Sequence, residues 1–187
     1  MKGMMMGFPL TLTHILDHAG QLFGSSEIVS RLPDKSLHRY AYREFHRRSL
    51  ALAEALQRAG LKPGDRVATL MWNHYVHLET YFGVPAAGGV LHTVNLRLHP
   101  NDLAYILNHA EDRVLIIDDT LLPLLDRVKD RVRFERVLVV PLTGKPVPAG
   151  FQSYEDFLAT ATGDFVPPNI SEDDAAGLCY TSGTTGR

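Results

Sequence analysis

Apolar residues recur with helical and strand periods along the chain, and the two periods alternate. Residues 42–59 place Phe45, Leu52 and Leu56 on one face while the arginines lie mostly elsewhere, which is typical of a surface helix over a core. Gly60 can end that helix in the left-handed conformation, and the turn residues 62–65 lead into the apolar run 67–72. The first unit is therefore a helix, a turn and a buried strand.

The same unit is repeated further along the chain. Residues 75–87 have helical periodicity, and we expect Pro85 to kink or shorten that helix. Pro100 and Asp102 suit the first turn of a second helix. Further strands are predicted at 90–94, 114–117 and 136–140, with a helix at 121–128 between the last two. This alternation predicts an α/β fold, a mainly parallel sheet covered by helices.

The last part of the chain adds a loop, a short helix and a final strand. Prolines and glycines in residues 141–150 indicate an exposed loop, and Ser153 with Asp156 predicts a capped helix that ends at Leu158. Residues 175–180 are apolar enough for a strand. That strand leads directly into a segment rich in hydroxyl groups and glycine.

Composition and charge narrow the class of protein. The 187 residues are 45% apolar and can bury a sizeable core, while a net charge of -2 with both signs interspersed argues against a nucleic-acid or anionic membrane partner. Residues 4–12 are too interrupted for an export signal, and no apolar run is long enough for a transmembrane helix, so any membrane contact is expected to be peripheral. Cys179 is the only cysteine, which favours a reducing, cytoplasmic setting, and we expect it to be a small buried hydrophobe.

The segment after the last predicted strand has the chemistry of a phosphate ligand. Its hydroxyls and glycines are Thr181, Ser182, Gly183, Thr184, Thr185 and Gly186. Glycine lets backbone amides approach an anion closely, and a hydroxyl can ligate the magnesium that a nucleotide carries. The spacing is not that of the P-loop NTPases, because Gly183 and Gly186 are separated by only two residues and Arg187 follows. The alternative is a flexible Ser/Thr/Gly tail.

At residues 180–186 the chain reads YTSGTTG, which resembles the signature loop of the adenylate-forming (AMP-binding) acyl-CoA synthetase superfamily. Residues 85–114 (PAAGGVLHTVNLRLHPNDLAYILNHAEDRV) and the segment WNHYVHLETYFGV are similar to its medium- and long-chain fatty acyl-CoA synthetase branch. The resemblance implies that Thr181 is the magnesium and phosphate hydroxyl, and that residues 182–186 surround the outer phosphates.

The resemblance also implies an activity: ATP-dependent conversion of a medium- or long-chain fatty acid to acyl-adenylate and then to acyl-CoA. ATP, Mg2+ and coenzyme A, as co-substrate, are the expected small molecules, and a homodimer is left open. Residues 1–187 would be the N-terminal portion of the large AMP-binding domain, without the C-terminal lid domain. The catalytic residues are expected beyond Arg187, so the fragment alone should be inactive.

Other functions remain open on the sequence. An aryl-CoA ligase, a peptide-synthetase adenylation domain or a luciferase-like oxidase would share the same loop. A short protein that binds nucleotide or oligomerises without chemistry is the alternative from another class.

Two histidine pairs have helical spacing, His14 with His18 and His74 with His77. We interpret both pairs as solvated residues on a helix face, since no third metal ligand is evident. His92 and Asn95 lie on or just after a predicted buried strand, where polar groups must be paired. The aromatic residues Trp72, Tyr75, Tyr81 and Phe82 could line an acyl tunnel, but their spacing favours the core.

Overall fold

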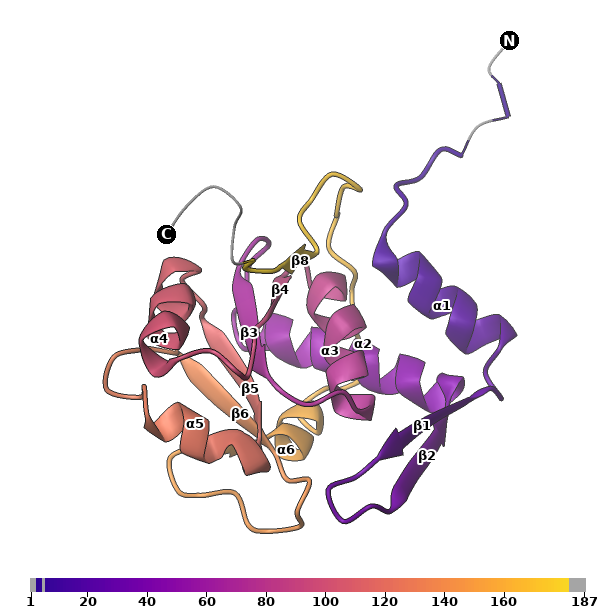
Figure 1. The fold of residues 1–187 in the computed structure, drawn as a ribbon. Helices are drawn as coiled ribbons and strands as arrows, with labels where there is room; N and C mark the ends of the chain where they lie inside the picture. Colours follow the sequence, from indigo (N-terminus) through magenta and orange to yellow (C-terminus); the bar gives the residue numbers. More distant parts are fainter. Residues whose placement is uncertain (1–2, 5, 182–187) are drawn as a thin grey trace.

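A computed structural model describes residues 3–4 and 6–181 of the chain. The first elements are a helix, a two-stranded antiparallel hairpin and a second helix (Figure 1). They are α1 (Leu12–Leu22), β1 (Glu27–Arg31), β2 (Leu37–Ala41) and α2 (Tyr42–Arg58). The hydrophobic pattern predicts only α2 among these elements, so α1 and the hairpin are additions from the structure.

The centre of the molecule is a parallel sheet. Its strands are β3 (Arg66–Leu70), β4 (Val90–Thr93), β5 (Val114–Asp118), β6 (Arg136–Val140), β7 (Gln152–Ser153) and β8 (Gly177–Leu178). In the described part of the chain six strands pair in the order β7-β6-β5-β3-β4-β8, and each neighbouring pair is parallel. The register aligns Thr69 of β3 with Thr93 on one side and with Ile116 on the other. The predicted α/β fold class is confirmed.

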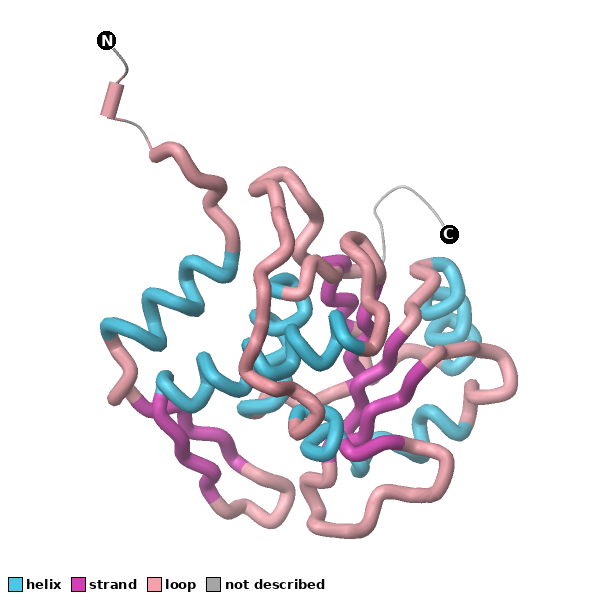
Figure 2. Tube along the Cα trace, turned by 180° about the vertical axis from the view of Figure 1, so that it is seen from behind, coloured by secondary structure: helices cyan, strands magenta, loops and turns pink. Residues whose placement is uncertain are grey.

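Helices cover both faces of this sheet (Figures 1 and 2). The remaining helices are α3 (Tyr75–Ala86), α4 (Pro100–His109), the 3-10 turn η1 (Asp119–Leu121), α5 (Leu122–Asp126) and α6 (Tyr154–Leu158). One core joins α2, α3 and α6 to the face that carries Val67, Ile116 and Leu138. The other joins α4 and α5 to the face that carries Leu115 and Ile117. Because side chains alternate along a strand, β5 supplies both cores.

Local chemistry explains where several elements begin and end. Gly60 follows α2 with a φ of 90°, the left-handed conformation that its lack of a side chain allows. Pro100 opens α4, and the ring of His99 accepts a hydrogen bond from the amide of Asn101. The Ser153 hydroxyl accepts from the Asp156 amide at the start of α6, as predicted. α3 ends at Ala86, one residue after Pro85.

A buried ionic network fastens three helices and the hairpin together. The carboxylate of Glu79, on α3, is fully buried and accepts hydrogen bonds from Arg48 Nε at 2.6 Å and Arg48 Nη2 at 3.2 Å. The hydroxyls of Tyr154 and Tyr40 donate to it at 2.8 and 3.2 Å. Arg48 also binds Glu155 at 2.7 Å. One carboxylate therefore connects α2, α3, α6 and β2.

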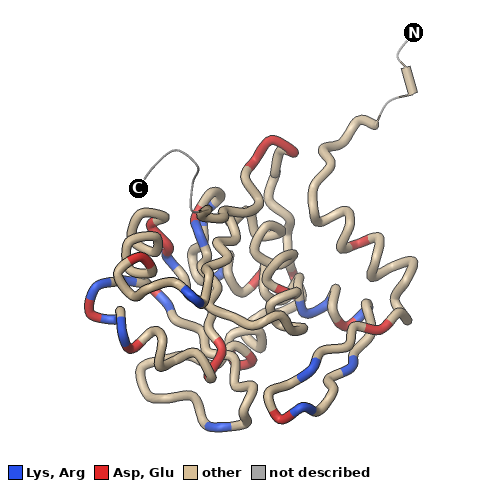
Figure 3. Tube along the Cα trace, in the orientation of Figure 1, with Lys and Arg blue, Asp and Glu red and all other residues tan. Residues whose placement is uncertain are grey.

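Charged residues of both signs are interspersed over the fold, as Figure 3 shows, in agreement with the net charge of -2. None of the helices in the described part of the chain has the length and apolar character required to span a bilayer.

Candidate functional site

The signature segment, residues 180–186, follows the edge strand β8. Leu91 and His92 of β4 pair with Gly177 and Leu178 of β8, and the Leu91 amide also donates to the carbonyl of Ala176. The predicted strand over 175–180 is thus paired over only two residues. Thr181, the proposed magnesium and phosphate hydroxyl, is exposed to solvent. The other predicted site residues, Ser182, Gly183, Thr184, Thr185 and Gly186, lie outside the described residues.

Tyr180, the first residue of the segment, is held between two histidines. Its hydroxyl lies 2.5 Å from His109 Nδ1, at the last residue of α4. Its ring centroid lies 5.2 Å from that of His92 and 5.8 Å from that of His109. Burial raises the pKa of the Tyr180 hydroxyl, with the charge of Asp112 acting in the same direction. The hydroxyl therefore stays protonated at neutral pH.

Beneath Tyr180 lies a fully buried imidazole–carboxylate pair. His92 Nδ1 is 2.7 Å from Asp112 Oδ2, and neither side chain is exposed. Burial raises the pKa of Asp112, while the hydrogen bond and charge of His92 oppose that rise. Within the described residues, His92 Nε2 and Asp112 Oδ1 are buried and have no hydrogen-bond partner. The sequence predicts that the polar side chain of His92 is paired. Its Nδ1 is paired with Asp112, whereas its Nε2 has no partner among the described residues.

A second buried pair marks the carboxyl ends of β3 and β5. His74 Nε2 lies 2.9 Å from Asp118 Oδ1, and Asp118 Oδ2 accepts from the amide of Trp72 at 2.8 Å. His74 Nδ1 accepts from the amide of Val76 and so caps α3. Both nitrogens of His74 are used locally, which gives this pair a structural role. His77, one turn on, lies 3.1 Å from the hydroxyl of Thr69.

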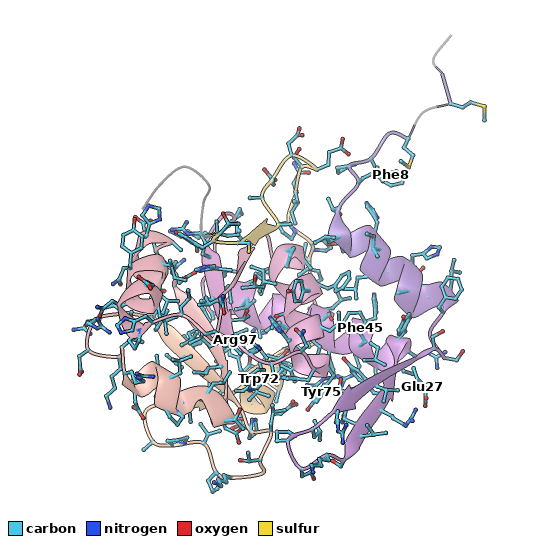
Figure 4. The ribbon with its side chains drawn as sticks, in the orientation of Figure 1. Phe8, Glu27, Phe45, Trp72, Tyr75 and Arg97 are labelled. Atoms are coloured by element: carbon cyan, nitrogen blue, oxygen red, sulfur yellow. The ribbon has the colours of Figure 1, made fainter. Side chains whose placement is uncertain are left out.

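Three expectations from the sequence are corrected by these positions. His74 and His77 are 8% and 7% exposed, so they are not solvated; α3 is covered by neighbouring elements on the side that carries them. Trp72 and Tyr81 are 51% and 43% exposed and do not belong to the core; Figure 4 labels Trp72 in the segment after β3. Cys179, one residue after the end of β8, is exposed and is not a buried hydrophobe.

Three candidates from the sequence remain: His14, His18 and Asn95. His14 and His18 are exposed on α1. Asn95 is also exposed, and its side chain accepts from the amide of Arg97. Among residues 3–4 and 6–181, no three His, Cys, Asp or Glu side chains are grouped so as to hold a metal.

A groove with a mainly apolar surface and a volume of about 840 Å³ lies in the described part of the chain. It lies between the start of α1 and residues 169–176, and it reaches Gly64 and Gly89, just before β3 and β4. His14 and His18 line it, whereas Thr181, the one predicted phosphate ligand among the described residues, does not.

Sequence reasoning missed the partners of the signature segment, His109 and Asp112. Both residues stand in the HAEDR stretch at 109–113. Nothing in a single sequence pairs His109 with Tyr180, 71 residues away, or Asp112 with His92, 20 residues away. The sequence offered only a weaker signal: an acidic residue two positions before a buried strand, Asp112, and a histidine inside another, His92.

Known proteins resemble the chain over nearly its whole length. A long-chain-fatty-acid–CoA ligase of Thermus thermophilus is 44% identical over 97% of the chain and 33% of its own length. A 3-methylmercaptopropionyl-CoA ligase of Ruegeria lacuscaerulensis is 41% identical, covering 100% of the chain and 35% of the relative. A medium-chain-fatty-acid–CoA ligase of Ectopseudomonas oleovorans is 36% identical with the same coverage. The chain spans about a third of the length of these relatives.

Solved structures agree on the fold. An anthranilate CoA ligase in complex with anthranoyl-AMP superposes with a TM-score of 0.83 at 23% identity, over 100% of this chain and 35% of that one. A long-chain-fatty-acid–CoA ligase from Archaeoglobus fulgidus gives 0.78 at 24% identity, over 97% of this chain and 37% of that one. The family model described as AMP-binding enzyme matches residues 17–187. With that match and the likeness at YTSGTTG, the chain belongs to the AMP-binding enzyme family.

Proposed function

We propose that the protein containing this chain is a fatty acid–CoA ligase, an acid–thiol ligase that activates a medium- or long-chain fatty acid with ATP. The observation that carries the proposal is the family match over residues 17–187, which includes the YTSGTTG segment. The relatives named for long-chain and medium-chain fatty acids, at 44% and 36% identity, support the choice of acid.

The proposed reaction has two steps. A carboxylate oxygen of the fatty acid attacks the α-phosphorus of ATP, the bond to the β-phosphate oxygen breaks, and pyrophosphate leaves. The sulfur of coenzyme A then attacks the carbonyl carbon of the acyl-adenylate, AMP leaves with the electrons of the carbon–oxygen bond, and the thiol proton passes to solvent. Charge accumulates on pyrophosphate in the first step, so donors fixed around the outer phosphates would lower that barrier.

We assign this task to the signature segment. The hydroxyl of Thr181 is proposed to bind phosphate and the magnesium that accompanies the nucleotide, and residues 182–186 are proposed to surround the outer phosphates. The exposure of Thr181 supports the proposal, since its hydroxyl is accessible to a ligand. In this reading magnesium arrives as part of the substrate MgATP, and Thr181 is one oxygen ligand among those of the phosphates.

We further propose that residues 1–187 form the N-terminal portion of the large AMP-binding domain. The catalytic residues and the C-terminal lid domain would then be supplied by other parts of the polypeptide. The coverage of about a third of each relative supports this arrangement. A cytoplasmic location is proposed from the single cysteine, and a homodimer is an expectation that light scattering can test.

A second class of carboxylic acid substrate also has an observation in its favour. Two 3-methylmercaptopropionyl-CoA ligases, from Ruegeria lacuscaerulensis and Ruegeria pomeroyi, are each 41% identical to the chain. That identity lies between those of the two fatty-acid ligases. A short carboxylic acid with a thioether is therefore the competing substrate.

The deciding experiment is ATP–pyrophosphate exchange by the complete protein encoded by the reading frame. We expect decanoate and palmitate to support exchange better than benzoate or 3-methylmercaptopropionate. If 3-methylmercaptopropionate supported faster exchange than decanoate and palmitate, the proposed substrate would change from a fatty acid to a short thioether acid. If no acid supported exchange, the proposal would be refuted. The chain of 187 residues, assayed alone, should form no acyl-CoA.

A further inference from the structure

One buried side chain on β4 has no role in the proposed reaction, yet it lies against the first residue of the signature segment. His92 is fully buried, and its ring lies 5.2 Å from that of Tyr180. The adjacency follows from the sheet, because β4 and β8 are parallel neighbours and His92 is aligned with Leu178. Tyr180, two residues further on, projects to the same face of the sheet, where it is partly buried and packs against the core that includes α4.

The orientation of that imidazole is set by Asp112. The carboxylate lies 2.7 Å from Nδ1, which leaves Nε2 as the second polar atom of the ring. Within residues 3–4 and 6–181, Nε2 is buried and has no hydrogen-bond partner. A buried polar atom without a partner is uncommon, which indicates that this ring is kept for more than its bond to Asp112.

The other side of Tyr180 is also held. His109 lies 2.5 Å from the hydroxyl, and its ring stacks on Tyr105 at 5.5 Å. Tyr180 is thus fixed at its ring by His92 and at its hydroxyl by His109. The segment that follows it begins from a residue with two separate anchors.

We propose that His92 is a positioning residue for nucleotide binding: oriented by Asp112, its ring supports Tyr180 and so sets where the phosphate-binding segment leaves the sheet. The inference rests on the proposed function of that segment. His92 touches no substrate in this account. Its removal should weaken ATP binding equally in the ground and transition states, which raises KM for ATP and leaves kcat nearly unchanged.

Two substitutions distinguish the effect of the His92 ring from the effect of its hydrogen bond to Asp112. His92→Asn places an amide nitrogen near the position of Nδ1, so the bond to Asp112 can persist while the ring beneath Tyr180 is lost. Asp112→Asn keeps the ring and retains an acceptor for Nδ1. The matched control is His74→Gln, because His74 is the imidazole of the other buried pair, with Asp118, and does not contact Tyr180.

The assay is ATP–pyrophosphate exchange by the complete protein with its best acid, giving KM for ATP, KM for the acid and kcat. We expect His92→Asn to raise KM for ATP by about tenfold with KM for the acid and kcat within about twofold. Asp112→Asn should change KM for ATP by less than about threefold, and His74→Gln should lower the melting temperature with KM for ATP unchanged. The proposal would be overturned if His92→Asn had the same KM for ATP as the wild type. It would also be overturned if His92→Asn and His74→Gln raised KM for ATP by the same factor.

A second assay tests the role of His92 even if the proposed ligase activity is wrong. If the wild-type protein exchanges pyrophosphate with no acid, the same variants are compared by the MgATP concentration that gives a half-maximal rise in melting temperature. His92→Asn should then need about tenfold more MgATP than the wild type, with His74→Gln unchanged. An equal requirement in His92→Asn and the wild type, or no response in the wild type, would also overturn the inference.

Discussion

Replacing Glu79 by glutamine tests how much the buried network contributes to the fold. The side chain is fully buried, and its two carboxylate oxygens receive two hydrogen bonds from Arg48 and one each from Tyr40 and Tyr154. Glutamine has nearly the same shape but only one acceptor oxygen. Whichever way its amide is turned, one bond from Arg48 and one from a tyrosine are lost, and an N–H group faces those donors.

The expected loss follows from this geometry. A hydrogen bond to a charged group contributes about 1.5–3 kcal/mol, and removing one partner of a buried ion pair costs about 3–5 kcal/mol. Because glutamine keeps half of the contacts, we expect the free energy of unfolding to fall by about 3 kcal/mol. For a chain of this size that loss lowers the melting temperature by about 6–12 °C.

Urea unfolding followed by circular dichroism measures the free energy, with thermal melting as a second readout. Glu44→Gln is the matched control, because Glu44 pairs with Arg47 on the exposed surface of α2. That change should cost less than about 0.5 kcal/mol. If Glu79→Gln and Glu44→Gln lowered stability by the same amount, the network would not stabilise the contact between α2, α3 and α6, and the reasoning would be refuted.

Three further changes test other parts of the fold. Burial, with a smaller effect of a neighbouring histidine, lowers the pKa of His77 to about 4, so the unfolded chain binds more protons between pH 6.5 and 4. Stability should fall by about 3 kcal/mol as the pH drops through that window, and His77→Gln should flatten the loss in urea unfolding. Gly83→Ala brings a methyl group to 2.8 Å from a backbone oxygen of α2 and should cost about 1–3 kcal/mol in thermal unfolding, whereas Gly7→Ala meets nothing within 4 Å and should be neutral. Glu54 accepts hydrogen bonds from the amide and hydroxyl of Thr162, so Glu54→Gln should speed hydrogen exchange at that amide; an unchanged rate would show that the contact does not order the loop.

Prediction from the sequence succeeded where one element carries its own hydrophobic period. The strand predicted at 136–140 is β6, and the helix predicted at 42–59 is α2 to within one residue. The hairpin of β1 and β2 has no such signal, because most of its residues are exposed or half-buried and its two strands are stabilised by pairing with each other. α1 is similar, with only Leu16 and Gly20 buried along its length.

The candidate site shows a second limit of prediction from the sequence. The letters YTSGTTG identify the segment, but its neighbours come from parts of the chain that meet only after folding. His109 is 71 residues from Tyr180, and Asp112 is 20 residues from His92. The error at His74 and His77 has the same cause: helical spacing places them on one face, but tertiary packing decides whether that face meets water or protein.

The two buried imidazole–carboxylate pairs share a feature that connects the fold to the site. Asp112 precedes β5 and Asp118 ends it, so the two carboxylates mark opposite ends of one fully buried strand. Their histidines come from different places: His74 follows β3, which pairs with β5, and His92 lies on β4, the next strand beyond β3. A parallel strand held by polar bonds at both ends cannot slip along its partners without breaking a buried pair. The Asp112–His92 contact reaches across β3 to β4, and β8 in turn pairs with β4, so this buried pair connects β5 with the strand that precedes Tyr180. The proposed positioning of Tyr180 therefore depends on Asp112 and His92, which precede it by 68 and 88 positions.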